Sequence, residues 1–332
     1  MRILQDNEIS IEKWNNLLSL CPFASPFQTP QYFDLICNIK EFDGKVYALE
    51  KSGLIRVLMV VSIMRESGVV GAFSRRGIIF GGPLIDGATH EDLLFFLSAV
   101  AKRLKRKVIY LETRNLFNYS LYKNSFLGSD WIYQSYLDVQ HDLKGVNKRE
   151  LLSSFKYNRR REIKQSIING ATYHLSIDKE EIFTVYKILQ QLYKDNVKLP
   201  LPAFEFFIGF LRTNLLKVFV VKHDEKIIGG SFCPVLPEKG LYTFYYCGLR
   251  DYHKQVFPTH LAVLAALEFA VENNIPKVSF MGAGKPDIGY GVRQYKLEFG
   301  GELVEYGRFL KVLNPFLYQI GKLGLKVYKI FR

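Results

Sequence analysis

The stretch with the clearest potential for chemistry spans residues 281–301 and reads MGAGKPDIGYGVRQYKLEFGG. It follows a strand-like run at residues 277–280. Gly282 and Gly284 then let the chain leave the strand through a tight turn, because glycine adopts backbone angles that other residues avoid. Loops held by a rigid scaffold commonly carry substrate-binding groups. Both glycines are therefore candidate substrate-binding residues.

A short helix predicted after the turn carries Arg293, Tyr295 and Lys296. A lysine ammonium beside the turn could stabilise the oxyanion that forms when an amine attacks an activated carbonyl. Tyr295 and Lys296 are therefore the candidate catalytic residues, and Arg293 is a candidate substrate-binding residue. The general base is open: Asp287 is one candidate, and a carboxylate or phosphate of the substrate is another. On spacing alone, a solvated lysine beside a core tyrosine is the alternative.

Several familiar motifs can be excluded. A dinucleotide fingerprint would need glycine where Asp287 stands, and a phosphate-binding loop would need serine or threonine where Pro286 stands. The chain has no serine-hydrolase elbow, no zinc-protease helix and no paired-carboxylate motif. We expect no metal and no tightly bound cofactor.

The order of glycine turn, aromatic–lysine pair and Phe-Gly-Gly resembles the C-terminal signature of the Fem family. These non-ribosomal peptidyl transferases add amino acids to peptidoglycan precursors. Tyr295-Lys296 matches the aromatic–lysine pair, with tyrosine in place of the more usual phenylalanine. In that family the pair lies at the transfer site. The resemblance therefore implies aminoacyl transfer beside Lys296, with aminoacyl-tRNA as the donor.

A second candidate site is the helix predicted at residues 151–169, which Gly170 would end. One face is apolar, and the rest carries a dense positive cluster formed by Lys156, Arg159, Arg160, Arg161 and Lys164. Like charges one helical turn apart repel by a few tenths of a kcal/mol per pair unless an anion lies between them. A phosphate-bearing ligand would relieve that repulsion, whereas a solvated charged face is the simpler alternative.

The Fem resemblance extends to this helix. Arg160, Ile163, Ser166 and Gly170 match the family's spacing of arginine, isoleucine, a small residue and glycine. The resemblance implies that the basic segment, with Arg160 and Lys156, binds an anionic precursor. Phe155, Ile163 and Ile167 are expected to form the apolar face of the helix.

Near the N-terminus, Gln28-Thr29 followed by Tyr32 also resembles the Fem pattern. The resemblance implies that Gln28 and Tyr32 contribute to substrate binding. Some members place a lysine four residues after the aromatic, and Ile36 stands there in this chain. That departure leaves the identity of the acceptor open.

Composition narrows the class of protein. The chain has 332 residues, and 45 lysines and arginines against 32 aspartates and glutamates give a formal net charge of +13. This length favours two domains. The charge favours an anionic partner such as RNA, a phosphorylated carrier or an anionic membrane face, or else serves solubility. Four cysteines without metal or redox spacing, expected to be buried thiols, and the lack of a signal peptide or membrane-spanning run predict a cytoplasmic protein.

One order of elements occurs twice along the chain: a hairpin, a strand, a helix and a strand. In the first half these elements are predicted at residues 46–64, 69–73 together with 78–80, 90–106 and 108–112, and in the second half at 218–235, 241–247, 259–273 and 278–280. This is the order of the GNAT acyltransferase fold, and the Fem resemblance also implies two such units. We therefore predict an α/β protein with mixed sheets and two tandem GNAT-like domains, residues 1–142 and 143–332. The second would contain the basic helix at 151–169 and a C-terminal amphipathic helix.

Two features bear on the donor and on location. GNAT enzymes bind the coenzyme A pyrophosphate through backbone N–H groups of a glycine-containing loop, and residues 249–257 contain no glycine. This weakens coenzyme A as the donor and favours aminoacyl-tRNA. The amphipathic tail at residues 314–332 could pack on the second domain or lie on the anionic inner face of a membrane.

The sequence thus predicts an N-acyltransferase that transfers an aminoacyl group from aminoacyl-tRNA to an amine of a peptidoglycan or other cell-envelope precursor. One alternative is an acyl-CoA-dependent N-acyltransferase acting on an amino sugar or a similar envelope metabolite. A second is a non-catalytic binder of RNA or of an anionic polymer.

Overall fold

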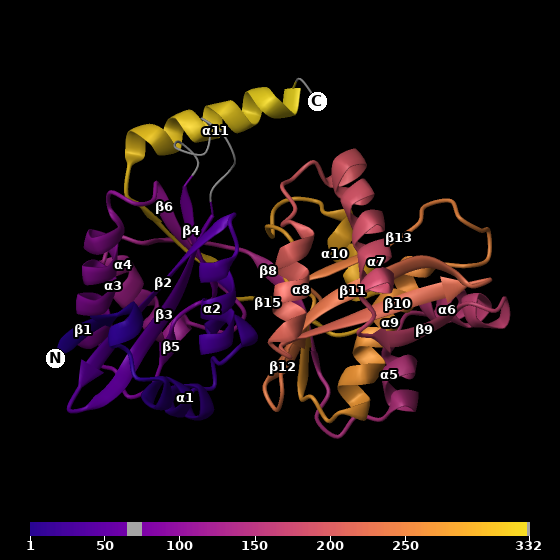
Figure 1. Ribbon diagram of the computed structural model, residues 1–332, viewed down its shortest axis with the longest axis horizontal. Helices are drawn as coiled ribbons and strands as arrows, with labels where there is room; N and C mark the ends of the chain where they lie inside the picture. The colour runs from indigo at the N-terminus through magenta and orange to yellow at the C-terminus, as the bar shows by residue number, and fades with distance from the viewer. Residues whose placement is uncertain (65–74, 331–332) are drawn as a thin grey trace. The chain divides into compact units, whose positions relative to one another are not determined.

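The computed structural model describes residues 1–64 and 75–330 (Figure 1). Its contacts divide the chain into two compact units. The first unit contains Met1–Tyr136 together with Glu305–Arg332, and the second contains Leu137–Val304. Each unit is built on one mixed β-sheet that helices cover. The predicted α/β class with mixed sheets is confirmed.

The sheet of the first unit has the strand order β1-β2-β3-β4-β6-β16-β7, with β5 paired to β3. β4 and β6 are parallel, and the other pairs are antiparallel. The strands are β1 (Arg2–Gln5), β2 (Phe42–Lys51), β3 (Leu54–Met64), β4 (Arg76–Gly81), β5 (Leu84–Ile85), β6 (Tyr110–Asn115), β7 (Ile132–Gln134) and β16 (Arg308–Val312). The strand predicted at residues 69–73 lies outside the described residues.

Side-chain caps begin the first two helices of the first unit. Ser10 accepts a hydrogen bond from the Lys13 N–H at 3.4 Å, and Thr29 accepts one from the Tyr32 N–H at 3.1 Å. These caps satisfy backbone donors that have no partner inside a helix. The helices are α1 (Ile11–Leu20), α2 (Pro30–Asn38), α3 (His90–Leu104), α4 (Lys123–Gly128) and α11 (Pro315–Ile330). Cys37, at the end of α2, is exposed, contrary to the predicted burial of all four thiols.

The sheet of the second unit has the order β15-β8-β14-β12-β11-β10-β9, with β13 paired to β11. β12 and β14 are parallel, like β4 and β6 in the first unit. The strands are β8 (Leu137–Asp142), β9 (Thr172–Ser176), β10 (Leu216–His223), β11 (Lys226–Leu236), β12 (Gly240–Tyr242), β13 (Tyr245–Gly248), β14 (Lys277–Ser279) and β15 (Glu302–Glu305).

The pairing between β12 and β14 ends at Tyr242 and Ser279. Beyond that point β13 pairs with β11, while residues 280–284 continue along β8. The central strands therefore separate beyond this point. The turn at residues 280–284 therefore begins where the sheet opens.

Two helices cover opposite faces of the second sheet. On β11, a Cβ added to Gly230 would lie 2.7 Å from Val185 of α7 (Lys179–Leu192), whereas the Ser231 hydroxyl bonds to the Ala262 carbonyl of α9 (Pro258–Glu272) at 2.9 Å. Neighbouring residues of a strand point to opposite faces. The apolar residues of α9 are buried on nearly all sides because α5 (Lys148–Ser154) and α6 (Tyr157–Ile168) also contact it.

The repeated order of elements is present in both units. The hairpin β2–β3, strand β4, helix α3 and strand β6 of the first unit correspond to β10–β11, β12, α9 and β14 of the second. The two parallel pairs occupy matching places in this order. The predicted tandem arrangement of two GNAT-like units is confirmed.

The helix predicted at residues 151–169 is two helices. The chain is extended at Phe155 and Lys156, with ψ angles of 149° and 150°, which separates α5 from α6. Phe155 is buried and packs on Phe299, and the Lys156 N–H bonds to the Glu298 carbonyl at 2.9 Å. These contacts with a distant segment replace the helical hydrogen bonds at the break. Ile167, predicted on the apolar face, is exposed.

The division of the chain differs from the predicted domains at 1–142 and 143–332. β8 joins the second sheet through β14, so residues 137–142 belong to the second unit. β16 pairs with β6 and β7, which returns the end of the chain to the first unit. The C-terminal helix α11 therefore belongs to the first unit, where the Tyr318 ring contacts Tyr110. No helix of the described residues is long and apolar enough to cross a membrane.

Candidate active site

The turn after β14 has an unusual backbone. Met281, Gly282 and Gly284 all have positive φ angles, of 52°, 80° and 80°. Two hydrogen bonds hold the turn: the Met281 N–H donates to the Ser279 hydroxyl at 3.1 Å, and the Ala283 N–H donates to the Leu137 carbonyl at 2.6 Å. A methionine in this conformation costs about 1–3 kcal/mol and persists only where the surroundings enforce it.

Lys296 is the group that organises this turn. It lies on α10 (Gly291–Leu297) and is 4% exposed. Its Nζ donates to the carbonyl oxygens of Phe280 at 2.7 Å, Met281 at 3.2 Å and Gly282 at 2.6 Å. All three protons of the ammonium group are therefore used, and the alternative of a solvated surface lysine does not hold.

Burial lowers the pKa of Lys296 to about 8, and the carboxylate of Asp138 opposes this shift. The protonated ammonium form is therefore the main form at pH 7. Because the three donors point to backbone carbonyls, direct donation to an oxyanion would require one of these bonds to be released. The geometry favours a lysine that acts on the turn itself.

A buried carboxylate supports the same turn from β8. Asp138 is 4% exposed and accepts hydrogen bonds from the Val139 N–H at 2.7 Å, the Gln140 amide at 2.9 Å and the Ser279 hydroxyl at 2.6 Å. Ser279 in turn accepts the Met281 N–H. The Asp138 carboxylate thus fixes the Ser279 hydroxyl, which accepts the N–H of Met281, the first residue of the turn with a positive φ angle.

Tyr295, beside Lys296, points in another direction, into a cluster of rings and charges. Its hydroxyl lies 3.3 Å from Nδ1 of His260, whose Nε2 lies 3.1 Å from the Glu162 carboxylate. Burial and the nearby Arg159 lower the pKa of His260 to about 3, so this imidazole is neutral at pH 7. The bonds then assign the tautomer: the tyrosine O–H donates to Nδ1, and Nε2–H donates to Glu162.

Arg159, like Asp138 and His260, has a role in this site that the sequence did not reveal. It was expected in the exposed positive cluster, yet it is 3% exposed. Its guanidinium donates to Glu162 at 3.2 Å and to the Glu298 carboxylate. The same group lies 4.7 Å from the ring centroids of both Tyr295 and Phe299. Arg159 therefore joins α6 to α10, and the spacing of Arg159 and Glu162 was the one sequence signal for it.

The remaining residues of the positive cluster are exposed. Lys156, Arg160, Arg161 and Lys164 lie at the surface of α6 or at its N-terminal end, and we call these four residues the α6 cluster. Arg160 uses one nitrogen to bond the Ser153 carbonyl at 2.7 Å. These side chains are accessible to an anionic ligand, as the predicted role of Lys156 and Arg160 requires.

Arg293 is engaged within the loop that follows the turn. Its guanidinium donates to the carbonyls of Ala283 at 2.8 Å and Ile288 at 3.1 Å, and also to those of Lys285 and Pro286. These donors hold the loop together, and the role of Arg293 as a substrate contact stays a prediction. Asp287, the candidate general base, lies exposed in the same loop.

Gln28 and Tyr32 lie in the first unit and are fully buried. The Gln28 amide donates to the Gly82 carbonyl at 2.6 Å and accepts from the Ser25 hydroxyl at 2.7 Å. The Tyr32 hydroxyl bonds to that of Ser62 at 3.1 Å, and burial raises the pKa of Tyr32. Both side chains serve the core of that unit, and their contribution to substrate binding stays a prediction.

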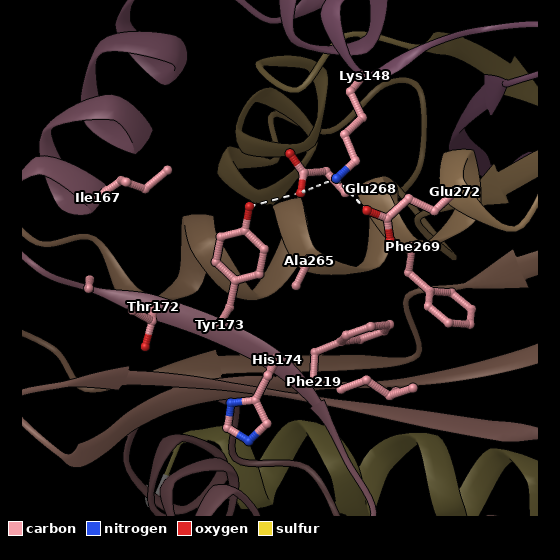
Figure 2. A pocket seen from close by; sticks show the side chains of 12 residues that line it. Lys148, Ile167, Thr172, Tyr173, His174, Phe219, Ala265, Glu268, Phe269 and Glu272 are labelled. Carbon is pink, nitrogen blue, oxygen red and sulfur yellow. Dashed lines mark hydrogen bonds and ion pairs between the residues drawn. The ribbon is translucent and has the colours of Figure 1, made fainter.

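A separate groove of about 490 Å³ lies beside the edge strand β9 and contains none of the predicted site residues. Figure 2 shows Lys148 between the carboxylates of Glu268 and Glu272, with the Tyr173 hydroxyl directed to Glu268. Lys148, Tyr173 and the two glutamates of the groove thus bond to one another. Among the described residues, no three His, Cys, Asp or Glu side chains are grouped as a metal site would require.

The sequence and the structure were compared with those of known proteins, and the structures identify the fold. No protein-family model matches the chain, and no curated protein matches it in sequence. Among solved structures, FemX superposes with a TM-score of 0.74 over 96% of this chain and 99% of its own, at 13% identity. The chain has the FemX fold.

Other structures with the same architecture agree. The C-terminal domain of a protein described as a lysylphosphatidylglycerol synthetase, from Agrobacterium fabrum, has a TM-score of 0.57 at 12% identity, covering 96% of this chain and 95% of its own. A tandem GNAT protein from the clavulanic acid biosynthesis pathway has a TM-score of 0.54 at 10% identity, covering 95% and 99%. The FemX fold is therefore a tandem GNAT arrangement, as the sequence predicted.

The buried Arg159 gives a direct test of how this FemX-like unit is held together. Replacing it with alanine leaves Glu162 and Glu298 without their shared cation, so we expect R159A to lower the free energy of unfolding by roughly 3–5 kcal/mol. The matched variant R161A removes an exposed arginine of the same helix and should change it by less than about 0.5 kcal/mol. Urea denaturation of both variants measures the difference, and equal values would contradict the bridging role.

His260 predicts a specific acid sensitivity. Its pKa is about 3 in the folded chain against an ordinary 6.5, so the unfolded chain binds a proton that the folded chain does not between these values. The free energy of unfolding must therefore fall as the pH decreases from 6.5 toward 3. His141, with a pKa lowered to about 4 by burial, acts in the same direction. H260Q should reduce the slope by up to about 1.4 kcal/mol per pH unit, and an unchanged slope would refute the neutral imidazole.

Proposed function

We propose that this protein is an N-acyltransferase that moves an aminoacyl group from aminoacyl-tRNA to an amine of an anionic cell-envelope precursor. The observation that carries the proposal is the buried Lys296 ammonium, held in the turn at the end of β14 of a chain with the FemX fold. We place the protein in the cytoplasm, where both substrates would be met.

Aminoacyl transfer to an amine requires few catalytic groups. A neutral amine attacks the activated ester carbonyl, and the enzyme must align the two and stabilise the charge that develops on oxygen. A positively charged turn at the opening of a sheet suits the second task. A general base must also accept the proton of the amine. Asp287, which is exposed in this loop, is one candidate, and a carboxylate or phosphate of the substrate is the other.

The N-terminus of α9 supports aminoacyl-tRNA over coenzyme A as the donor. In the GNAT mode this helix end presents free N–H groups to a pyrophosphate. Here the Phe257 N–H donates to the Ser166 hydroxyl of α6 at 2.9 Å, and Pro258 has no N–H. A Cβ on Gly248 would lie 2.7 Å from the Thr259 nitrogen, so the first turn of the helix lies tightly against β13. Few donors remain for a pyrophosphate.

The α6 cluster supports an anionic acceptor. Its four cations are exposed and lie on the helix whose buried Arg159 is linked to Glu298, next to α10. The name of one structure with this fold, a protein described as a lysylphosphatidylglycerol synthetase, agrees with an envelope acceptor, as does the resemblance of the sequence to the Fem family. A phosphorylated peptidoglycan precursor would bring both the anion and the amine. Peripheral contact with the inner membrane face, through α11, would bring the enzyme to a lipid-linked form of that acceptor.

A donor assay tests the proposal. The protein is incubated with a mixture of ¹⁴C-aminoacyl-tRNAs and a UDP-linked muramyl pentapeptide, and in parallel with acetyl-CoA and glucosamine. We expect label to leave the tRNA only when the pentapeptide is present, and to appear on the free amine of the pentapeptide. In the parallel reaction we expect no release of the free coenzyme A thiol from acetyl-CoA.

The other outcomes are equally defined. Thiol release with acetylated glucosamine would establish the acyl-CoA-dependent reaction instead. Salt-dependent binding of uncharged tRNA without transfer to either amine would contradict the proposal and support an RNA binder.

A further inference from the structure

The contacts of Lys296 single out one backbone donor in the turn. The lysine binds the carbonyls of three successive peptide groups, and each group also carries an N–H. The N–H of Met281 is taken by Ser279, and that of Ala283 is taken by Leu137. Among the hydrogen bonds of the described residues, the Gly282 N–H has no acceptor.

The position of this donor follows from peptide geometry. The described chain has no cis peptide bonds, so the N–H of Gly282 points opposite to the Met281 carbonyl. That carbonyl faces the Lys296 ammonium at 3.2 Å. The N–H is therefore directed away from the lysine. A cation bound to the carbonyl of an amide also polarises its N–H and makes it a stronger donor.

Space is available beside the Cα of Gly282. Gly282 is half-buried, and a Cβ built on it would meet no atom within 4 Å. By contrast, a Cβ built on Gly284 would lie 3.0 Å from the Tyr290 ring. A substrate atom can thus approach the backbone at Gly282, where glycine also tolerates the φ angle of 80°.

We propose that the Gly282 N–H is the oxyanion donor of the transfer reaction, and that Lys296 acts as a positioning residue through the peptide group it binds. The inference rests on the proposed function. As the amine nitrogen bonds to the ester carbonyl carbon, the carbonyl π electrons move to oxygen, which accepts the Gly282 N–H. When the carbonyl re-forms, the bond to the tRNA hydroxyl oxygen breaks, and that oxygen leaves with the proton that the amine loses.

Replacing one amide with an ester tests the donor without altering a side chain. Glycolic acid at position 282 removes this N–H and weakens the Met281 carbonyl as an acceptor. The matched control places the hydroxy acid of methionine at position 281, which removes the N–H bonded to Ser279 and weakens the Phe280 carbonyl in the same way. Both esters thus loosen one lysine contact, but only the first removes the proposed donor.

In the aminoacyl-tRNA and pentapeptide assay, the ester at 282 should lower kcat by about 10²–10³-fold with KM unchanged. The ester at 281 should lower kcat by less than about tenfold. Equal losses from the two esters would overturn the inference while leaving the function intact. If the unmodified protein transfers no label, the proposed function fails instead.

A second measurement does not depend on the folding of a variant. In a structure of the unmodified protein with an aminoacyl adenosine whose ester is replaced by an amide, we expect the carbonyl oxygen within hydrogen-bond distance of the Gly282 nitrogen. A carbonyl oxygen bound to any other donor would overturn the inference.

Discussion

The site depends on one reciprocal interaction, the bond between a buried ammonium and three carbonyls of a turn with positive φ angles. The carbonyls of Phe280, Met281 and Gly282 converge, and such convergence is repulsive unless a cation lies between them. The lysine, in turn, is costly to bury unless its donors are satisfied. The ammonium offsets the repulsion between the carbonyls, and the carbonyls offset the cost of burying the ammonium. The strained conformation of Met281 therefore persists in the folded chain.

A second buried cation fixes the position of the helix that carries Lys296. Arg159 of α6 binds Glu298 at the end of α10 and covers the rings of Tyr295 and Phe299. His260 of α9 extends this network to the Tyr295 hydroxyl. The two most buried cations of the second unit's candidate site thus serve the scaffold. The exposed α6 cluster can meet an anion in solution.

Much of this structure could be predicted from local patterns. The repeated order of elements and the helix end at Gly170 follow from periodicity and capping, which depend on near neighbours. The glycine turn and the aromatic–lysine pair likewise indicated where the candidate site lies.

What the sequence did not reveal depends on distant partners. Arg159 meets Glu298 across 139 residues, and the break at Phe155 depends on the same distant segment. Spacing also cannot distinguish an arginine that binds substrate from one that, like Arg293, holds four carbonyls of its own loop. The domain boundary was missed because β8 and β16 each pair with strands far away in the chain.

The proposed chemistry depends on the pKa of Lys296. A pH titration of ¹³Cε-labelled lysine, followed by NMR together with the carbonyl carbons of residues 280–282, measures it in the unmodified protein. The lysine should titrate near pH 8, and the three carbonyl shifts should move with it. A lysine that titrates at its ordinary value of 10.5, with carbonyl shifts that do not respond, would contradict a buried ammonium bound by the turn.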